Sequence, residues 1–480
     1  MAQKKPKMTV FTISMMTAAA VVSLRGLPMM GKEGLTMFFY ILFSTLVFLV
    51  PASLVSAELG GAFSKKGGGV YTWVKEAFGS RWGFTAIWLQ WIQNVVWYLP
   101  VLGFAAACLA YVFMQPSLAD SGYFTGAVVL VIYWAATLLA LQGHDVAGQV
   151  TKYGMLLGTV LPGLVIIVLG LLWIDMGNAI QFLQPASAGS DGGAQGPHAR
   201  LFPHITGLGD IAFLAGIILL FAGVEVHAVH ANELEDPSRQ FPESLLLAAI
   251  VIFVLFTAGS FAVAAVIPAE EISLTAGLMQ AFQAILAKFD IAFLTPLMGL
   301  LVAFGVIGQV MSWVDGPSRG LLETAKEGEI PPFLARTNQN GVQRNILIIQ
   351  ALIITLLSAL YFIMDNVSVA FFVLSAMTVT LYLAMYILMF AAAIKLRITR
   401  PDLPRSYKVP GGTVGMVLVA GLGLLGVSFA LVVGFFPPSN LPVGSPALYV
   451  GLVAAGMIVF IGLPLIINAL KKPEWKPDPS

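Results

Sequence analysis

Long apolar stretches follow one another along the whole chain, and short polar connections separate them. Each stretch is close to the roughly 20 residues that an α-helix needs to cross a bilayer. Twelve such segments are predicted, at 9–30, 36–61, 83–114, 122–142, 150–174, 207–231, 244–267, 291–314, 345–363, 367–394, 414–436 and 447–469. We therefore expect an all-α membrane protein with about 12 transmembrane helices.

The composition agrees with a membrane protein and excludes the soluble classes. Hydrophobic residues make up 58% of the 480 residues and charged residues 10%, whereas soluble domains carry about 25% charged residues. Too little polar surface remains to cover a soluble fold, so a soluble enzyme, a nucleic-acid binder and a disordered chain are excluded. The single cysteine, Cys108, permits neither an internal disulfide nor a cysteine metal site.

The distribution of lysine and arginine tests the number of spans. With the N-terminus in the cytoplasm, 21 of the 25 basic residues fall on the cytoplasmic side and Arg25 falls within the first span. Only Lys32, Arg200 and Lys288 fall outside. Such an excess is what the positive-inside rule demands. We therefore predict a multi-pass protein of the cell (inner) membrane with both termini cytoplasmic. The basic, then apolar N-terminal segment resembles a secretory signal, but so many later spans favour an uncleaved first helix.

Two of the predicted spans are interrupted. Ser23-Leu-Arg-Gly-Leu-Pro28 breaks the first, and a turn near Gly223-Val-Glu225 breaks the sixth. Each break carries an ionisable residue at membrane depth. Unwound backbone is tolerated in a membrane only where it lines a polar cavity, so paired breaks indicate the binding site of a transporter. The alternative is a glycine or proline kink whose freed groups are satisfied by neighbouring helices.

Several motifs resemble those of the amino acid–polyamine–organocation permeases. They are Gly67-Gly-Gly-Val-Tyr-Thr-Trp73, Phe221-Ala-Gly-Val-Glu225, Gly316-Pro-Ser-Arg-Gly320 and Asn338-Gln-Asn-Gly-Val342. Further motifs are similar to those of the bacterial glutamate/GABA antiporter group, namely His230-Ala-Asn-Glu233, Pro401-Asp-Leu403 with Val409-Pro-Gly-Gly412, and Phe436-Pro-Pro-Ser-Asn440. The resemblance extends over nearly the whole chain.

This resemblance implies a leucine-transporter fold with 5+5 inverted repeats plus two C-terminal helices. The first repeat (helices 1–5) would occupy 1–174 and the second (helices 6–10) 207–396. A glycine- and serine-rich outer loop at 175–206 would join them. Helices 11–12 and a short cytoplasmic tail would follow at 397–480.

The resemblance also implies a substrate site between helices 1, 3, 6, 8 and 10. The residues expected to bind or gate the substrate are Ser23, Arg25, Gly26, Gln93, Asn94, Gly223, Glu225, Trp313, Tyr382 and Tyr386. Glu225 matches the family's gating and proton-sensing glutamate, and Lys152 matches the lysine that takes the sodium position in sodium-independent members. Both are therefore predicted to couple transport. Structural alternatives stay open for four of these residues. Glu225 could be a structural cap, Lys152 could be an ordinary basic residue of the cytoplasmic side, and Gln93 and Asn94 could form interhelical hydrogen bonds.

Arg25 allows three interpretations. Its guanidinium stays charged and must find a partner or water. It could pair with Glu225, anchor a substrate carboxylate through two parallel hydrogen bonds, or reach the outer interface. The glycine-rich first-helix motif of the wider family is absent, and Ser23-Leu-Arg-Gly26 occupies its place.

The function implied is secondary exchange rather than catalysis. The family resemblance favours an antiporter that trades a glutamate-like amino acid for its decarboxylated, GABA-like product by alternating access. A proton-coupled amino-acid importer and an exchanger of amino acids for amines such as tyramine or putrescine are the alternatives. No nucleotide-binding motif is present, and we expect no cofactor, no metal and no nucleic-acid partner. The expected partners are amino acids, protons and the bilayer, with the protein a monomer or a homodimer.

Overall fold

The computed structural model describes residues 9–63, 69–183, 200–204, 207, 212–226, 234–325, 327–364, 366–437 and 445–476. Within these ranges every regular element is a helix. Ten helical stretches are long and apolar enough to cross a membrane. They correspond to ten of the twelve predicted spans, and the two others are the first and sixth, which are broken. This confirms the all-α membrane fold.

The first half of the chain contains nine helices that form the predicted spans and one connection. These are α1 (Val10–Val21), α2 (Gly26–Gly31), α3 (Thr36–Ser44), α4 (Val50–Ala62), α5 (Val70–Phe78), α6 (Ser80–Val112), α7 (Gly122–Leu141), α8 (His144–Met155) and α9 (Leu161–Asp175). A π-helical turn joins α3 to α4 at Thr45–Leu49 and another joins α8 to α9 at Leu156–Val160, so each pair forms one span.

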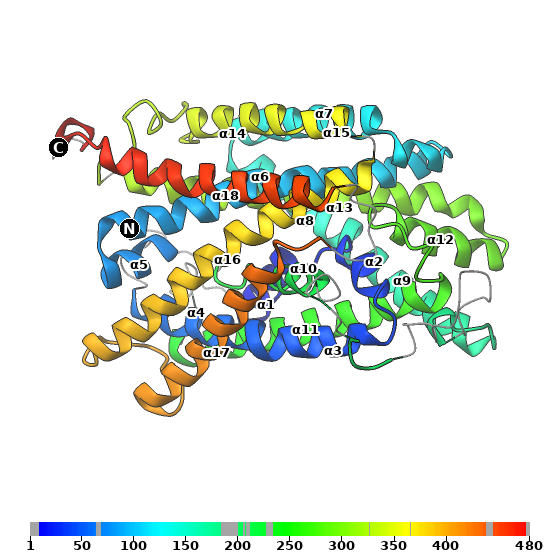
Figure 1. Ribbon diagram of the computed structural model, residues 1–480, viewed down its shortest axis with the longest axis horizontal. Helices are drawn as coiled ribbons and strands as arrows, with labels where there is room; N and C mark the ends of the chain where they lie inside the picture. The colour runs from blue at the N-terminus through cyan, green and yellow to red at the C-terminus, as the bar shows by residue number, and fades with distance from the viewer. Residues whose placement is uncertain are drawn as a thin grey trace.

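The second half begins with the broken sixth span. Its helices are α10 (Ala212–Leu220), α11 (Pro237–Val266), α12 (Gly277–Lys288), α13 (Thr295–Ala325), α14 (Arg344–Leu357), α15 (Ala359–Ile363), α16 (Val367–Thr399), α17 (Gly412–Val433) and α18 (Pro446–Ala469). The long helices run mainly along the longest axis of the molecule, with α16 and α17 tilted across it (Figure 1). α6 packs against α13 and α16, while α1 packs against α11 and α13, and α10 against α16.

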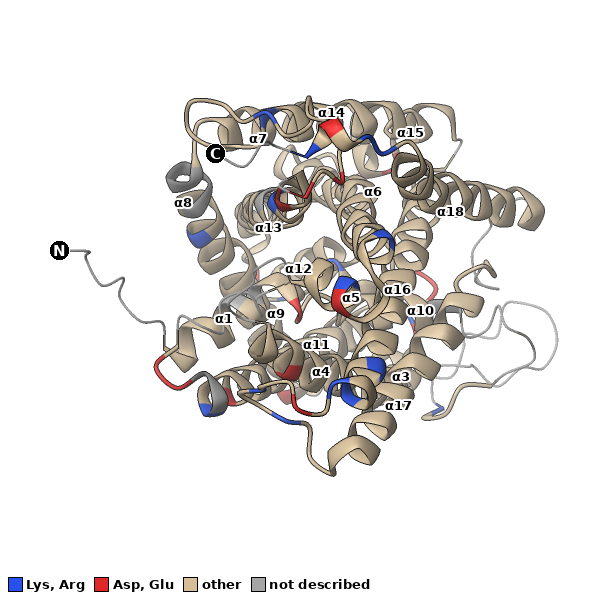
Figure 2. Cartoon of the chain, turned by 90° about the vertical axis from the view of Figure 1, so that its left-hand side faces the viewer, with Lys and Arg blue, Asp and Glu red and all other residues tan. Residues whose placement is uncertain are grey.

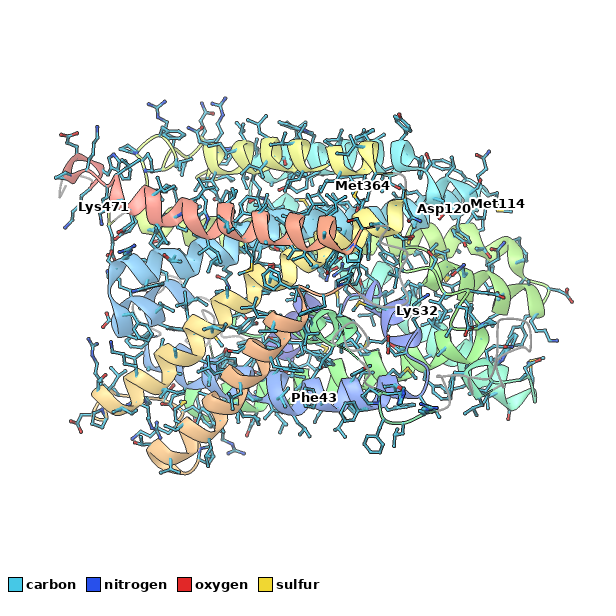
Figure 3. All side chains as sticks on the ribbon, in the orientation of Figure 1. Lys32, Phe43, Met114, Asp120, Met364 and Lys471 are labelled. Atoms are coloured by element: carbon cyan, nitrogen blue, oxygen red, sulfur yellow. The ribbon has the colours of Figure 1, made fainter. Side chains whose placement is uncertain are left out.

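The two ends of the molecule separate the connections as the span count predicts. Lys471 lies at one end and Met114 and Asp120 lie at the other (Figure 3). The Lys471 end, here called the basic end, is seen face-on in Figure 2, where both signs of charge gather around α5 and α14.

Ion pairs at the basic end join connections that were predicted to share one side. Lys75 pairs with Glu327, and Lys471 Nζ lies 2.9 Å from Glu329 Oε1. On the other side, Lys32 Nζ donates to the carbonyl oxygens of residues 269 (3.3 Å) and 272 (3.2 Å). These contacts bring connections that were predicted to share a side to the same end of the molecule.

A buried ionic cluster explains why α16 extends beyond the predicted end of its span at 394. Arg397 Nη1 lies 2.7 Å from Glu58 Oε1, and Arg405 Nε lies 2.8 Å from the same oxygen. The other oxygen, Oε2, accepts the Val409 N–H at 2.7 Å. Hydropathy ends the span where charges begin, but a buried arginine with a carboxylate partner lets the helix continue. 

The eighth span is also longer than predicted, since α13 ends at Ala325 and not at 314. The helix runs through Pro317, which removes one backbone hydrogen bond. The Ser318 hydroxyl donates to the Val314 carbonyl oxygen across the same turn. The Gly316-Pro-Ser motif therefore belongs to the helix rather than to the connection that follows it.

The turn between α2 and α3 gives a pH-dependent prediction. Burial raises the pKa of the Glu33 carboxyl to about 8, against the opposing effect of Lys32. A carboxyl with a raised pKa favours the folded state fully below its ordinary value, about 4.5, and this contribution is lost as the pH rises through about 8. We expect Glu33→Gln, which copies the protonated acid, to raise the Tm in detergent more at pH 9 than at pH 5.

The matched control for this prediction is Glu271→Gln, which changes an exposed acid on the same side of the molecule. It is expected to shift the Tm equally at the two pH values. An equal shift for Glu33→Gln at pH 5 and pH 9 would show that Glu33 ionises as freely in the folded protein as in the unfolded chain.

Candidate functional site

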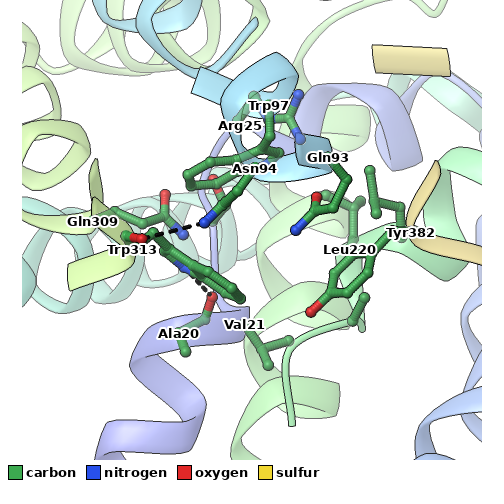
Figure 4. A pocket seen from close by; sticks show the side chains of 13 residues that line it. Ala20, Val21, Arg25, Gln93, Asn94, Trp97, Leu220, Gln309, Trp313 and Tyr382 are labelled. Atoms are coloured by element: carbon green, nitrogen blue, oxygen red, sulfur yellow. Dashed lines mark hydrogen bonds between the residues drawn. The ribbon is translucent and has the colours of Figure 1, made fainter. Parts of the chain in front are cut away.

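A small cavity lies between the two broken helices (Figure 4). Its walls come from the breaks and from α6, α13 and α16, and the lining residues are Ala20, Val21, Ser23, Arg25, Gln93, Asn94, Trp97, Leu219, Leu220, Ala222, Gln309, Trp313 and Tyr382. The cavity volume open to the centres of water molecules is about 30 Å³, which is room for roughly two or three waters. An amino acid needs more space, so its entry requires the walls to move apart.

The first break leaves backbone donors free beside this cavity. α1 ends at Val21 and α2 begins at Gly26. Among the described residues, no acceptor is found for the backbone N–H groups of Ser23, Leu24 and Arg25. The turn closes through Gly26 N–H, which donates to the Ser23 carbonyl oxygen at 3.0 Å. The predicted interruption is therefore present and exposes donors that suit an anionic group.

Glycine is required at the second break. Gly223 has φ +117°, in the region that favours glycine. A Cβ at this position would lie 3.1 Å from the Trp313 ring, and the Gly223 N–H donates to the Tyr386 hydroxyl at 2.9 Å. At the first break, a Cβ on Gly26 would lie 2.6 Å from the Leu220 side chain. Both predicted glycines thus permit close packing at the breaks.

Glu225 lies at the second break and is 2% exposed. Its Oε1 accepts from Gln90 Nε2 at 3.1 Å and from the Tyr382 hydroxyl at 2.5 Å, and its Oε2 accepts from the Tyr386 hydroxyl. Three donors thus surround the carboxylate, as a buried charge requires. Of these four side chains, Tyr382 alone borders the cavity. Glu225 is therefore linked to the cavity by its contact with Tyr382. Sequence reasoning had not identified its partner Gln90.

Arg25 borders the cavity and is 6% exposed. Its Nη1 donates to Ser375 Oγ at 3.4 Å, and its Cζ lies 5.6 Å from the centre of the Phe371 ring. Its buried Nε has no hydrogen-bond partner. Across the described ranges no carboxylate lies within 4.0 Å of the guanidinium, so the pairing with Glu225 is not seen. Its burial also differs from that of a side chain that reaches the outer interface, and the role of substrate anchor stays a prediction.

Trp313 connects the first break to α6. Its Nε1 donates to the Ala20 carbonyl oxygen at 3.3 Å, and its own carbonyl oxygen accepts from Asn94 Nδ2 at 3.2 Å. Its ring lies 5.9 Å from that of Trp97. Gln93 Nε2 donates to the Gln90 carbonyl oxygen at 3.1 Å. The structure thus brings the predicted Trp313, Tyr382, Gln93 and Asn94 to one cavity, while Tyr386 does not line it.

Lys152 is the predicted residue that lies apart. It is exposed on α8, with its ammonium 5.6 Å from the Tyr153 ring, and it does not line the cavity. Its coupling role stays a prediction. The His230-Ala-Asn-Glu233 motif lies outside the described residues.

Two polar or aromatic cavity residues were not predicted, Trp97 and Gln309. Trp97 follows Gln93 by one helical turn, and Gln309 precedes Trp313 by one turn. Positions four apart share a helix face, so this spacing would have identified both once Gln93 and Trp313 were chosen.

Comparison with known sequences decides the family. The sequence model of the family described as amino acid permease matches residues 8–462, which is nearly the whole chain. The chain is a member of the amino acid permease family. This permease is therefore a multi-pass membrane transporter of small molecules and not an enzyme.

Individual relatives of the permease cover it almost completely. An uncharacterized transporter from Legionella pneumophila is 36% identical over 97% of each chain. A glutamate/gamma-aminobutyrate antiporter from Lactococcus lactis is 33% identical over 97% of this chain and 90% of its own. A probable agmatine/putrescine antiporter from the same species is 25% identical over 90% of this chain and 89% of its own. The permease is thus similar to antiporters of two different substrate classes.

Proposed function

We propose that this permease is a secondary antiporter that exchanges a glutamate-like amino acid for its decarboxylated, GABA-like product. The observation that carries the proposal is Arg25, a buried arginine without a described acidic partner, on a cavity between two broken helices. A buried guanidinium without a counter-ion is costly. A cargo carboxylate would complete the site.

The chemistry of exchange narrows what the cavity must recognise. Decarboxylation of glutamate removes the α-carboxylate and leaves the ammonium and the distal carboxylate. A carrier that binds substrate and product in turn must therefore hold these two shared groups. Arg25 suits the distal carboxylate, because a planar guanidinium forms two parallel hydrogen bonds to it. The free N–H groups of Ser23 and Leu24 suit the α-carboxylate that only glutamate has.

A diamine cargo fits the cavity less well. Two ammonium groups call for acidic side chains in the lining. None of the thirteen lining residues is acidic, and Glu225 lies behind Tyr382 and is occupied by three donors. The similarity to the agmatine/putrescine antiporter therefore supports the fold more than the substrate.

Alternating access links the cavity to transport. The cavity has room for only a few waters, so substrate must separate the broken helices from α6 and α13. An empty carrier gains no such contacts and therefore does not return. Glu225 connects the second break to α16 through Tyr382 and Tyr386, and we assign proton coupling to it and a supporting role to Lys152.

We place the basic end and both termini in the cytoplasm and the protein in the inner membrane. We propose a monomer or a homodimer as the transporting assembly.

Exchange by purified protein in liposomes tests this proposal. Vesicles are preloaded with GABA, glutamate, putrescine, tyramine or buffer, and uptake of labelled glutamate is measured. We expect GABA and glutamate inside to stimulate uptake and putrescine and tyramine to resemble buffer. Stimulation by the amines would favour the amine exchanger. Equal uptake into buffer-loaded vesicles under an inward proton gradient would favour the proton-coupled importer.

A further inference from the structure

Gln309 on α13 is a polar residue that the structure leaves without a partner. It is 8% exposed, lines the cavity and takes part in no side-chain hydrogen bond with any described residue. Its backbone carbonyl oxygen accepts from the Ser312 hydroxyl, and the side-chain amide takes no part in this bond. A buried amide without a partner costs stability unless a ligand or water completes it.

The neighbouring amides define what kind of group this part of the cavity can receive. Asn94 Nδ2 and Gln93 Nε2 each donate to a backbone carbonyl oxygen, and a carbonyl oxygen can only accept. Each nitrogen thus makes one of its two possible hydrogen bonds inside the protein, while neither amide oxygen accepts a hydrogen bond from a described residue. Figure 4 shows the Gln309 amide on the same side of the cavity as Trp313 and close to Asn94, with Gln93 across from it. Three amide oxygens without a described donor therefore belong to residues that line one cavity, and an ammonium group is a donor that suits them.

We propose that Gln309 is a specificity-determining residue whose amide oxygen, with those of Asn94 and Gln93, receives the ammonium group of the cargo. This inference rests on the proposed exchange of a glutamate-like acid for its decarboxylated product. Glutamate carries a carboxylate on the same carbon as its ammonium, and the product does not. A neutral acceptor holds the ammonium in both, whereas an acidic side chain would attract the product and repel the α-carboxylate.

Gln309→Glu tests this directly, because it replaces a neutral acceptor by a charged one of the same size. Hydrogen bonds to charged groups are stronger than those between neutral groups. We expect the ratio of the apparent affinity for GABA to that for glutamate to rise about tenfold, measured as competition against labelled GABA uptake into GABA-loaded vesicles. Gln115→Glu, which adds the same charge at an exposed position beyond α6, is expected to leave the ratio unchanged.

Gln309→Met provides a second readout if the acidic variant does not fold. It keeps the length of the side chain and removes both polar atoms, and we expect the affinities for GABA and glutamate to fall together, about fivefold. A loss confined to glutamate would show that the amide donates to the α-carboxylate and would overturn the inference. An unchanged ratio in Gln309→Glu, with wild-type exchange intact, would also overturn it. If the wild type shows no GABA–glutamate exchange, the proposed function itself fails.

Discussion

Replacement of Arg25 by lysine is expected to weaken the binding of acidic substrates by about ten- to a hundredfold. Lysine keeps the charge but cannot form the two parallel bonds of a guanidinium. A hydrogen bond to a charged group is worth roughly 1.5–3 kcal/mol, which corresponds to that change in affinity. The measurement is the concentration of glutamate that gives half-maximal uptake into GABA-loaded vesicles.

A control variant is available at Ser375, the residue to which Arg25 donates a hydrogen bond. Ser375→Ala removes the hydroxyl that accepts from Nη1 at 3.4 Å, a long and therefore weak bond. We expect this variant to lose much less affinity than Arg25→Lys. Wild-type glutamate affinity in Arg25→Lys would contradict the anchor role and remove the main local reason for an acidic substrate.

Replacement of Glu225 by glutamine is expected to slow exchange by about ten- to a hundredfold and to flatten its pH dependence. Gln90, Tyr382 and Tyr386 would lose a charged acceptor, at roughly 1.5–3 kcal/mol for such a bond. The amide keeps the shape of the acid but cannot gain or lose a proton. The rate of exchange is measured from pH 4.5 to 8 with equal pH on both sides of the vesicle.

Tyr386→Phe separates the two effects in this prediction. It removes one donor to the carboxylate and also the acceptor of the Gly223 N–H, but it leaves the acid in place. We expect a slower rate that still depends on pH, because the acid can still gain and lose a proton. If Glu225→Gln keeps both the full rate and the pH profile of the wild type, Glu225 takes no part in the exchange.

The spans were predictable from sequence because bilayer thickness fixes the length of an apolar helix. The break at residues 23–28 was predictable because Gly26 and Pro28 interrupt an apolar run, and Pro28 is tolerated in the first turn of α2, where its missing N–H is not needed. The extension of α16 to Thr399 was not predictable, since it depends on Glu58, which lies 339 residues away from Arg397.

The cavity was predictable in part. The family resemblance supplied Asn94, Trp313 and Tyr382, and each lines it. Helical spacing from Gln93 and Trp313 would have added Trp97 and Gln309. It could not add Gln90, because α6 is buried on nearly all sides and no polar face indicates a direction. The surroundings of Arg25 were also hidden, since Phe371 and Ser375 reach it only through tertiary packing.

Protection of a cysteine by substrate tests most directly whether cargo binds between the broken helices. Cys108, the single cysteine of the chain, is replaced by alanine, and Ser23→Cys places one thiol on the cavity wall. Ser445→Cys, at an exposed position before α18, is the control. The account predicts that glutamate and GABA slow labelling of position 23 by a small polar thiol reagent and leave position 445 unaffected. Unchanged labelling of position 23 at glutamate concentrations that saturate exchange would contradict it.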